Sequence, residues 1–303
     1  MVGVTGRRRR VRVGFTDRVF YLIIGLFLLV CLVVVILPLA NVLSNSLSSA
    51  TAVARGVVWL VPVEFTLGSY QRILEDGQML RGMYNSLFYT TIGTILNVTL
   101  TIMAAYPLAR KTFYGRKLIT IILAFTLLFS GGIVPRYLMV KSLGMVDTRW
   151  AMILPEAVLV WYVIIARTFL QNTIPQELYD AAEIDGASDV RIITSVVVPL
   201  SGPIVAVLSL FYAVVHWNRY FDALIFLKSE HLWNLQLVLR NIIMSAARLI
   251  GEEQDIGNAM LIQEQIEVMK YAVIVFAAVP IMLLYPFVQR YFIKGIMIGS
   301  LKG

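Results

Sequence analysis

The chain has 303 residues, of which 59% are hydrophobic and only 15% are charged, and its mean hydropathy is +0.79. Ordinary globular domains are about 45–50% apolar and about 25% charged, so these values exclude a water-soluble globular protein and indicate a polytopic membrane protein. The net charge of +8 does not indicate nucleic-acid binding, because the arginines crowd at the N-terminus beside a hydrophobic run. The single cysteine, Cys31, lies in that run, which excludes an intrachain disulfide and a thiolate metal cluster.

Apolar runs recur from one end of the chain to the other. A spanning helix needs about 20 mostly apolar residues, because the hydrocarbon core is about 30 Å thick. The sequence therefore predicts an all-α fold with about six spans, at residues 19–40, 84–109, 118–140, 151–170, 196–215 and 268–292. We expect a basic N-terminal arm, residues 1–18, and one transmembrane domain, residues 19–303, because no stretch has the composition of a soluble domain.

The basic residues near the span ends predict the orientation, since cytoplasmic flanks are enriched in Lys and Arg. Basic clusters lie in the N-terminal arm, after the second span and at the C-terminus. With six spans all three clusters fall on one side, which predicts that both termini are cytoplasmic. The outer segments are then residues 41–83, 141–150 and 216–267, and we expect the last to form short helices that cap the outer mouth.

Within the spans, two local features are informative. Gly131 and Gly132, followed by Pro135, predict a break or bend in the third span, which serves either a gate or close helix packing. Arg167 lies near the cytoplasmic end of the fourth span, where we expect its side chain to snorkel to the interface.

Residues 180–199 (DAAEIDGASDVRIITSVVVP) form a polar, acidic island between the fourth and fifth spans. Pro175 and Gly186 bracket an expected helix, proline in the first turn and glycine just past the end, with Thr173 as its expected N-cap. Gly186 permits a sharp turn, and Ser188 is expected to cap a second short helix that runs towards Pro199. The sequence thus predicts a cytoplasmic loop, residues 173–195, of two helices joined at an angle.

One face of the first helix carries small side chains. Leu178, Ala181, Ala182 and Asp185 follow the i, i+3, i+4, i+7 spacing that places residues on one face. The two alanines allow another surface to approach closely. Glu177 lies early in the helix, where a carboxylate suits the helix dipole.

The order Asp180-Ala181-Ala182, then Gly186, then Val196, Val198 and Pro199 resembles the EAA loop of ATP-binding-cassette (ABC) importer permeases. That loop reads Glu-Ala-Ala, three residues, Gly, nine residues and Ile-x-Leu-Pro; here Asp replaces Glu, and Val replaces Ile and Leu. The segments HWNRYFDALIFL (216–227), VKSLGMVDTRWAMILP (140–155) and QRYFIKGIMIGSLKG (289–303) are similar to carbohydrate permeases of the maltose-type uptake family. The likeness covers almost the whole chain and points to the oligosaccharide branch of that family.

The resemblance implies a type I importer permease in the bacterial cytoplasmic membrane. Its partners would be a second homologous permease, a cytoplasmic ATPase dimer that binds ATP and Mg²⁺, and an extracytoplasmic sugar-binding protein. The chain itself would carry no cofactor, metal or catalytic residue. The first helix of the island would be the coupling helix that docks into the ATPase. The residues expected to couple to it are Glu177, Asp180, Ala181, Ala182, Asp185, Gly186, Ala187 and Pro199.

A substrate path is less sharply indicated. Polar residues in a span face other helices or a water path, because facing hydrocarbon is costly. These polar side chains either form hydrogen bonds between helices or line a sugar passage, and the sequence leaves both alternatives open. Aromatic rings at span ends serve either as anchors at the membrane interface or as surfaces on which sugar rings stack. The expected path residues are Asn85, Asn97, Trp161, Trp217 and Asn218.

A membrane-embedded enzyme and an ion-coupled secondary carrier are the alternatives to the importer. The sequence contains no GxxxxGK[ST] phosphate loop, HExxH site or GxSxG elbow. A membrane-embedded enzyme needs clustered ionisable residues within the spans, and an ion-coupled secondary carrier needs intramembrane acids. Neither pattern is evident, and dependence of uptake on ATP rather than on an ion gradient separates the carrier from the importer.

Overall fold

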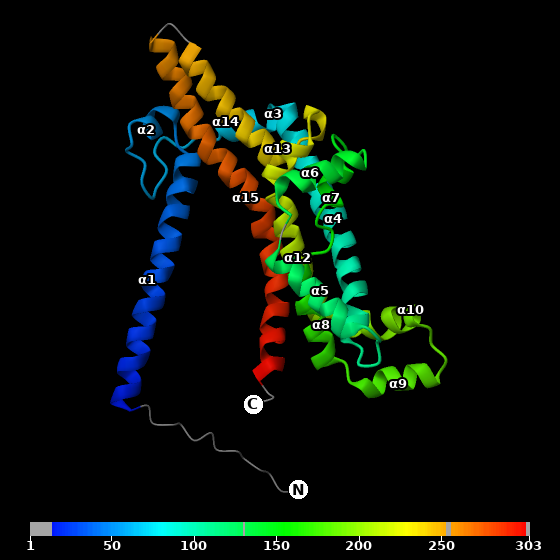
Figure 1. Ribbon diagram of the computed structural model, residues 1–303. Helices are drawn as coiled ribbons and strands as arrows, with labels where there is room; N and C mark the ends of the chain where they lie inside the picture. Colours follow the sequence, from blue (N-terminus) through cyan, green and yellow to red (C-terminus); the bar gives the residue numbers. More distant parts are fainter. Residues whose placement is uncertain (1–13, 130, 253–255, 301–303) are drawn as a thin grey trace. The chain divides into compact units, whose positions relative to one another are not determined.

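The computed structural model describes residues 14–129, 131–252 and 256–300, and all regular structure within them is helical (Figure 1). The helices are α1 (Phe15–Ser46), α2 (Ala50–Ala54), α3 (Gly68–Glu75), α4 (Gly77–Ala109), α5 (Arg116–Leu128), α6 (Ile133–Ser142), α7 (Trp150–Ile153), α8 (Val160–Thr173), α9 (Gln176–Ile184), α10 (Asp189–Ile192), the π-helix η1 (Ile193–Val197), α11 (Val198–Leu200), α12 (Gly202–Trp217), α13 (Tyr220–Phe226), the 3₁₀ helix η2 (Glu230–Leu232), α14 (Leu235–Glu252) and α15 (Ile256–Ser300). The chain divides into two compact units, residues 1–69 with 263–275, and residues 70–262 with 276–303.

The first unit is built around α1, whose side chains from Phe15 to Leu39 are exposed. A helix that is apolar all round needs an apolar environment, and in this chain that environment is lipid or a partner helix. A small core follows α1, where Ala52, Val53 and Val58 pack against Val268 of α15. Ser49 begins α2 by accepting a hydrogen bond from the Ala52 N–H (3.2 Å).

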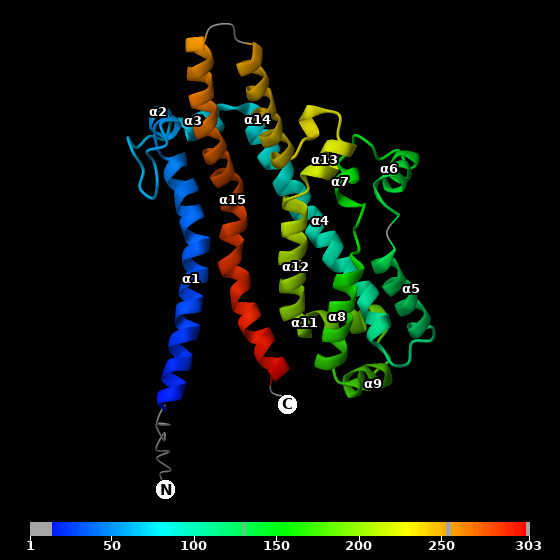
Figure 2. The same ribbon diagram turned by 60° about the vertical axis from the view of Figure 1, so that its left-hand side comes forward.

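The second unit is built around α4, which packs most extensively against α12 and α8 and then against α14. Asp76 caps α4 by accepting hydrogen bonds from the N–H groups of Gln78 (2.8 Å) and Met79 (3.1 Å), so the helix begins before the expected start at residue 84. Figure 2 shows α4 running from the level of α13 and α14 to the level of α9. The helix therefore extends between the two ends of this unit.

Among the residues that the structure describes, three helices are long and apolar enough to cross a membrane by themselves, namely residues 15–46, 77–109 and 263–283. Two more crossings are possible if each of two bent helix pairs is one span. The pairs are Arg116–Leu128 with Ile133–Ser142, bent by 115°, and Asp189–Leu200 with Gly202–Trp217, bent by 85°. The first bend confirms the break expected at Gly131 and Gly132, and Gly132 has a φ of +77° that a side chain would disfavour.

The fourth expected span, residues 151–170, differs from the expectation because it is not one continuous helix. The four-residue α7 precedes the linker 154–159, and only then does α8 begin. Pro155 lacks an N–H for a helical bond, and Glu156 has a φ of +65° that a right-handed helix does not contain. The 14 residues of α8 rise about 21 Å, less than the hydrocarbon thickness of about 30 Å.

The outer segment 216–267 forms short helices in its first part, as expected, namely α13 and η2. It then continues into the longer α14 and the start of α15. The helices of this segment pack on α4, because α14 and η2 both contact it. The part of the segment that contains η2 and α14 therefore belongs to the packed structure of the second unit.

We predict that Gly93→Ala loosens the contact between α4 and α12. A Cβ at Gly93 would lie 2.4 Å from Nε2 of His216, which is fully buried and packed tightly there. Overpacking of this kind costs about 1–3 kcal/mol. Thermal unfolding of the purified protein in detergent measures the loss. Gly25→Ala is the control, because nothing lies within 4 Å of a Cβ there, and an equal loss in both variants would contradict the packing argument.

Candidate functional site

The two-helix loop, residues 175–200, connects α8 to α12 in the chain, and its helices α9 and α10 lie at the lower right of Figure 1. α9 begins directly after Pro175, whose φ of −62° and extended ψ place it at the N-cap position. The expected cap, Thr173, is wrong, because α8 continues through Thr173 and ends there. Proline can begin a helix without a capping side chain, since its missing N–H would have no partner in the first turn. Glu177 lies in that first turn, as expected.

A left-handed glycine ends α9. Gly186 has a φ of +71°, its N–H donates to the Glu183 carbonyl (3.0 Å), and the Ala187 N–H donates to the Ala182 carbonyl (2.9 Å). These two bonds form a Schellman motif, which satisfies the last carbonyls of the helix. Ser188 then caps α10 by accepting a hydrogen bond from the Arg191 N–H (3.4 Å). The expected pair of short helices joined at glycine is confirmed.

A buried arginine ties both helices of the loop to the end of α4. The Arg110 side chain is 7% exposed and pairs with Glu183 of α9. Its guanidinium carbon also lies 4.5 Å from the centroid of the Tyr179 ring, within the range of a cation–π contact. Arg110 donates to the Tyr106 hydroxyl (3.3 Å), and that hydroxyl donates to Oδ1 of Asp189 in α10 (2.9 Å).

This cluster was not found from the sequence. Arg110 counted only as one of the basic residues that set the topology, and Glu183 and Asp189 counted as polar residues of the island. The available signal was a basic residue at the end of a span on the same side of the membrane as an acidic loop. That signal does not choose among Arg110, Lys111 and Arg116, because the choice depends on how α4 and α9 cross.

The side chain of Arg167 is half-buried and contacts the end of α4, and its expected snorkelling to the interface stays a prediction. Its Nε donates to the Leu108 carbonyl (3.1 Å), at the C-terminal end of α4, and the Gln171 amide reaches the same carbonyl at 3.4 Å. The last carbonyls of a helix have no partner within the helix, so side chains from α8 satisfy them. The end of α4 is thus held by α8 as well as by the loop.

The outward side of the two-helix loop carries exposed apolar side chains among charged ones. Ile184 is 86% exposed, Val190 is 70% exposed and Leu178 is 43% exposed. Exposed apolar side chains grouped beside polar ones mark an interaction surface. The loop therefore offers two sides, one packed on the protein and one free for a partner.

The expected coupling residues divide between these two sides. Exposed among them are Glu177, Asp180, Ala181, Asp185, Gly186 and Pro199. Ala182 and Ala187 are half-buried and pack against the core that contains Tyr179 and Ile192. The alanine face of α9 is consequently shared, because Ala181 faces outward while Ala182 contacts the protein.

The expected path residues lie in two kinds of place. Asn85 donates to the His231 and Trp233 carbonyls (2.9 Å each), Asn97 bonds Nε2 of His216 (2.9 Å), and Trp217 donates from Nε1 to the Ala277 carbonyl (3.0 Å). All three are buried. Asn85 and Asn97 thus make hydrogen bonds of the kind that was one of the two open readings for polar span residues, whereas Trp161 and Asn218 are exposed. A path role stays a prediction for all five residues.

A four-charge cluster lies where the third and fourth expected spans break. Arg136 of α6 pairs with Glu156 of the linker and with Asp222 of α13, and Arg219 pairs with Glu156 at 3.0 Å. Arg219 also donates to the carbonyls of Met152 (3.1 Å) and Pro155 (3.3 Å). The cluster thereby satisfies the backbone of the broken span as well as its own charges.

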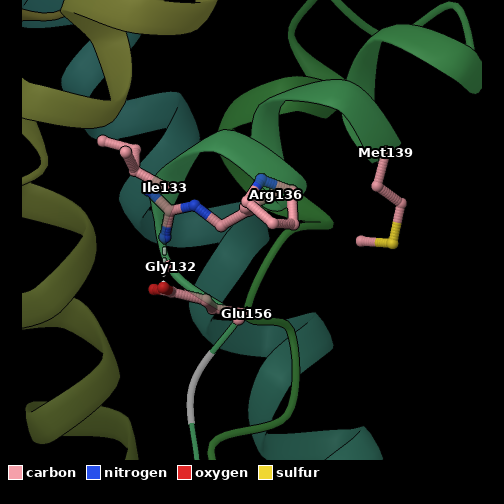
Figure 3. Close-up of a pocket in the computed structure, with 7 residues that line it drawn as sticks. Gly132, Ile133, Arg136, Met139 and Glu156 are labelled. Atoms are coloured by element: carbon pink, nitrogen blue, oxygen red, sulfur yellow. Dashed lines mark hydrogen bonds and ion pairs between the residues drawn. The ribbon is translucent and has the colours of Figure 1, made fainter.

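A pocket of about 540 Å³ opens beside Arg136 and Glu156. Its remaining lining is Gly131, Gly132, Ile133, Pro135 and Met139. Figure 3 shows the Arg136 guanidinium facing the Glu156 carboxylate, with Met139 apart from the pair. The pocket thus places a paired arginine and glutamate beside apolar walls.

Comparison with known proteins followed three routes. No family model matches the chain. The chain is 38% identical over 287 residues, covering 95% of this chain and 99% of the relative, to the "Polygalacturonan/rhamnogalacturonan transport system permease protein YtcP" of Bacillus subtilis (strain 168). It is 28% identical over 282 residues, 89% of this chain and 92% of the relative, to the "Arabinooligosaccharides transport system permease protein AraQ" of Halalkalibacterium halodurans (strain ATCC BAA-125 / DSM 18197 / FERM 7344 / JCM 9153 / C-125).

A solved structure is similar over nearly the same length. A chain of a bacterial ABC transporter involved in the import of the acidic polysaccharide alginate superimposes with a TM-score of 0.82 and 29% sequence identity. The match covers 92% of this chain and 98% of that chain. The likeness therefore extends over nearly the whole of both chains.

The carboxylate of Asp147, in the turn after α6, binds residues 228 and 229, and a change of pH tests how much these hydrogen bonds stabilise the protein. Its carboxylate accepts hydrogen bonds from the Ser229 hydroxyl (2.6 Å) and from the N–H groups of Lys228 and Ser229 (2.8 Å each), and these bonds, the hydroxyl first, lower its pKa. The stabilisation is present above the ordinary pKa of about 3.9 and is lost as pH falls through the lowered value. We expect Asp147→Asn to lower the melting temperature at pH 7 and the difference to shrink at pH 3.

The control for this prediction is Glu230→Gln, which removes an exposed carboxylate of the same segment. It should leave the melting temperature unchanged at pH 7. A constant difference between wild type and Asp147→Asn across that pH range would contradict the role of the Asp147 charge.

Proposed function

This chain belongs to the permease family of ABC sugar importers, and on that premise we propose that it forms one half of a translocation path whose movements are driven through the two-helix loop. Sugar transport across the membrane follows from the family itself. The proposal adds the partners: a second homologous permease, a cytoplasmic ATPase dimer that binds ATP and Mg²⁺, and an extracytoplasmic sugar-binding protein. Both termini and the loop lie in the cytoplasm, and hydrolysis takes place in the ATPase subunit.

The observation that carries the proposal is the exposed apolar side of the two-helix loop. Ile184 is 86% exposed and Val190 is 70% exposed, and the same loop carries exposed carboxylates at Asp180 and Asp185. A cleft with apolar walls and basic rims on the ATPase would bury both kinds of group. The rest of the loop is anchored on the permease by Tyr179, Ile192 and Arg110, so force on one side reaches the other.

The orientation is supported by the position of the basic residues. The loop lies at the end of α4 where Arg110, Lys111, Arg116 and Lys117 follow in the chain. Cytoplasmic flanks are enriched in Lys and Arg, so this end of α4 belongs inside. The N-terminal arm, with arginines at positions 7–10, 12 and 18, belongs on the same side by the same rule.

An ion-coupled carrier and a membrane-embedded enzyme are the alternatives. A carrier couples through acids within its spans. In the described part of the chain the acids of the second unit lie in the two-helix loop, at helix ends, in the turn after α6 (Asp147) or in the four-charge cluster, where Glu156 and Asp222 are both paired with arginine. Dependence of uptake on ATP, with no effect of dissipating the ion gradients, distinguishes the importer from the carrier.

The proposed cargo is an oligosaccharide of uronic acids. One relative is named for polygalacturonan and rhamnogalacturonan, and the solved neighbour takes part in import of an acidic polysaccharide. A galacturonan carries a carboxylate on each sugar ring. In the pocket beside Arg136 the apolar walls suit a pyranose face, and a sugar carboxylate would bind the guanidinium by replacing Glu156 or Asp222 as its partner.

We predict that docking is lost when the exposed apolar surface of the loop is charged. Ile184→Asp places a carboxylate in the middle of that surface without touching the core, so the permease should fold while the ATPase no longer co-purifies. A buried, unpaired charge at an interface costs about 2–5 kcal/mol, enough to abolish a stable complex. Pull-down of the ATPase with the tagged permease measures it.

Val57→Asp is the matched control. Val57 is also an exposed β-branched apolar side chain, but it lies in the expected outer segment 41–83, away from the proposed docking surface. It should leave the ATPase bound. Wild-type recovery of the ATPase with Ile184→Asp would remove the docking role of the loop.

We predict that the reconstituted complex imports charged sugars in preference to neutral ones. Proteoliposomes that contain both permeases and the ATPase receive the binding protein and either trigalacturonate or the matched neutral trisaccharide of galactose. ATP-dependent uptake of the labelled trigalacturonate should exceed that of the neutral sugar at least about tenfold, because a site that recognises a carboxylate discriminates against the analogue that lacks it. Equal uptake would contradict the uronate cargo, and uptake without ATP would contradict the importer.

A further inference from the structure

Polar side chains hold α4 at both of its ends, and the two ends serve different parts of the protein. The helix has 33 residues and so rises about 50 Å. At its C-terminal end Arg110 and Tyr106 hold the two-helix loop. At its N-terminal end a second group of polar side chains holds the segment 231–235, which lies in the expected outer segment.

The outer attachment consists of hydrogen bonds between side chains of α4 and the backbone of that segment. Asn85 donates to the His231 and Trp233 carbonyls (2.9 Å each), and the Tyr89 hydroxyl donates to the Leu232 carbonyl (2.8 Å). Ser86 accepts a hydrogen bond from the Leu235 N–H (2.8 Å). Because these partners are backbone groups, a shift of α4 moves the chain itself and not only a side chain.

Between the two attachments α4 is packed too closely to bend independently of its neighbours. A Cβ at Gly93 would lie 2.4 Å from the His216 ring of α12, and one at Gly82 would lie 2.9 Å from the Val238 side chain of α14. Thr101 adds a hydrogen bond to the Tyr212 hydroxyl of α12 (2.7 Å). Interiors packed in this way transmit displacement rather than absorb it.

The inner attachment depends on one residue. Arg110 pairs with Glu183 in α9, lies against the Tyr179 ring, and donates to the Tyr106 hydroxyl that holds Asp189 in α10. The side chain is 7% exposed, so these contacts are made away from the outward side of the loop. Each helix of the loop thus reaches α4 through the same guanidinium or through the tyrosine beside it.

We propose that α4 is the connecting element that carries motion of the two-helix loop to the outer segment 231–235, and that Arg110 is the positioning residue that joins the loop to it. The inference rests on the proposed function, because the motion comes from the ATPase bound to the loop. The outward side of the loop does not depend on Arg110, since the Schellman turn at Gly186 and the cap at Ser188 lie within the loop. Removal of Arg110 therefore loosens the transmission and leaves docking in place.

The test uses the complete complex in proteoliposomes, with the binding protein and labelled trigalacturonate. Arg110→Ala should retain the bound ATPase and its basal ATP hydrolysis. Sugar imported per ATP hydrolysed should fall at least about fivefold, the lower end of the range for a coupling between two sites. Arg110→Lys keeps the charge but not the forked geometry, so its value should lie between those of Arg110→Ala and wild type.

A probe at the outer end reports the motion directly. The chain has one cysteine, so Cys31→Ser with Glu230→Cys gives a single labelling site beside the outer attachment, on an exposed side chain. A non-hydrolysable ATP analogue should change the emission of a fluorophore at this site in the otherwise unchanged complex. The change should be at least about fivefold smaller with Arg110→Ala, because coupling is lost and not binding.

Two further variants separate a specific contact from a general loss of charge. Lys111→Ala removes the same charge one residue further on, where the side chain is exposed, and should import as wild type does. Arg110→Glu combined with Glu183→Arg restores the pair in reverse and should recover part of the lost import. If the Arg110→Ala permease does not assemble into the complex, the same measurements are made on Glu183→Gln. This change removes the carboxylate that pairs with Arg110 and keeps the shape of the side chain.

The outcomes are distinct. If wild type imports sugar and Arg110→Ala, or Glu183→Gln in its place, shows the same import per ATP and the same probe response, the inference is overturned while the proposed function stands. An equal loss with Lys111→Ala also overturns it. If the wild-type complex imports no sugar in response to ATP, the proposed function itself fails.

Discussion

The structure of the second unit depends on the need of polar groups inside a membrane protein to find partners within the protein. Lipid offers no hydrogen bonds, so a polar side chain on a span is costly unless another helix satisfies it. α4 carries such side chains at Asn85, Tyr89, Asn97 and Thr101, and each bonds another part of the same unit. These bonds, together with the apolar core that α4 shares with α8 and α12, hold one face of α4 towards α12 and the segment 231–235.

α1 shows the opposite case. Its residues from 19 to 39 carry almost only apolar side chains and are exposed throughout, whereas half of the most apolar stretch of α4 is buried. A helix without polar or small residues has little that would fix it against a neighbour in lipid, where association depends on close packing and hydrogen bonds. The difference between the two helices follows from composition alone, although both are long enough to span.

The two ion clusters have the same physical role at different ends of the unit. Buried ion pairs contribute little net stability, because desolvation offsets the attraction, but removing one partner is costly. Such pairs therefore determine geometry more than they add stability. Arg110 places the two-helix loop on α4, and Arg136 with Arg219 places α6, the linker 154–159 and α13 around the pocket. Non-helical backbone at membrane depth is tolerated where protein satisfies it or where it lines a cavity, and the linker meets both conditions.

The sequence by itself determined the class of fold, the places of the long helices and the local form of the loop, since these depend on apolar run length, on glycine at a left-handed turn and on a serine cap. Gly186 and Ser188 act through bonds within a few residues, which is why their spacing was sufficient. Only the tertiary structure decided the break of the fourth span, the partner of Arg167 and the meeting of Arg110 with Glu183, 73 residues apart in the chain. Such pairings depend on how helices cross. Several charged side chains near a helix end are equally suitable partners, and their spacing in the sequence does not show which one forms the pair.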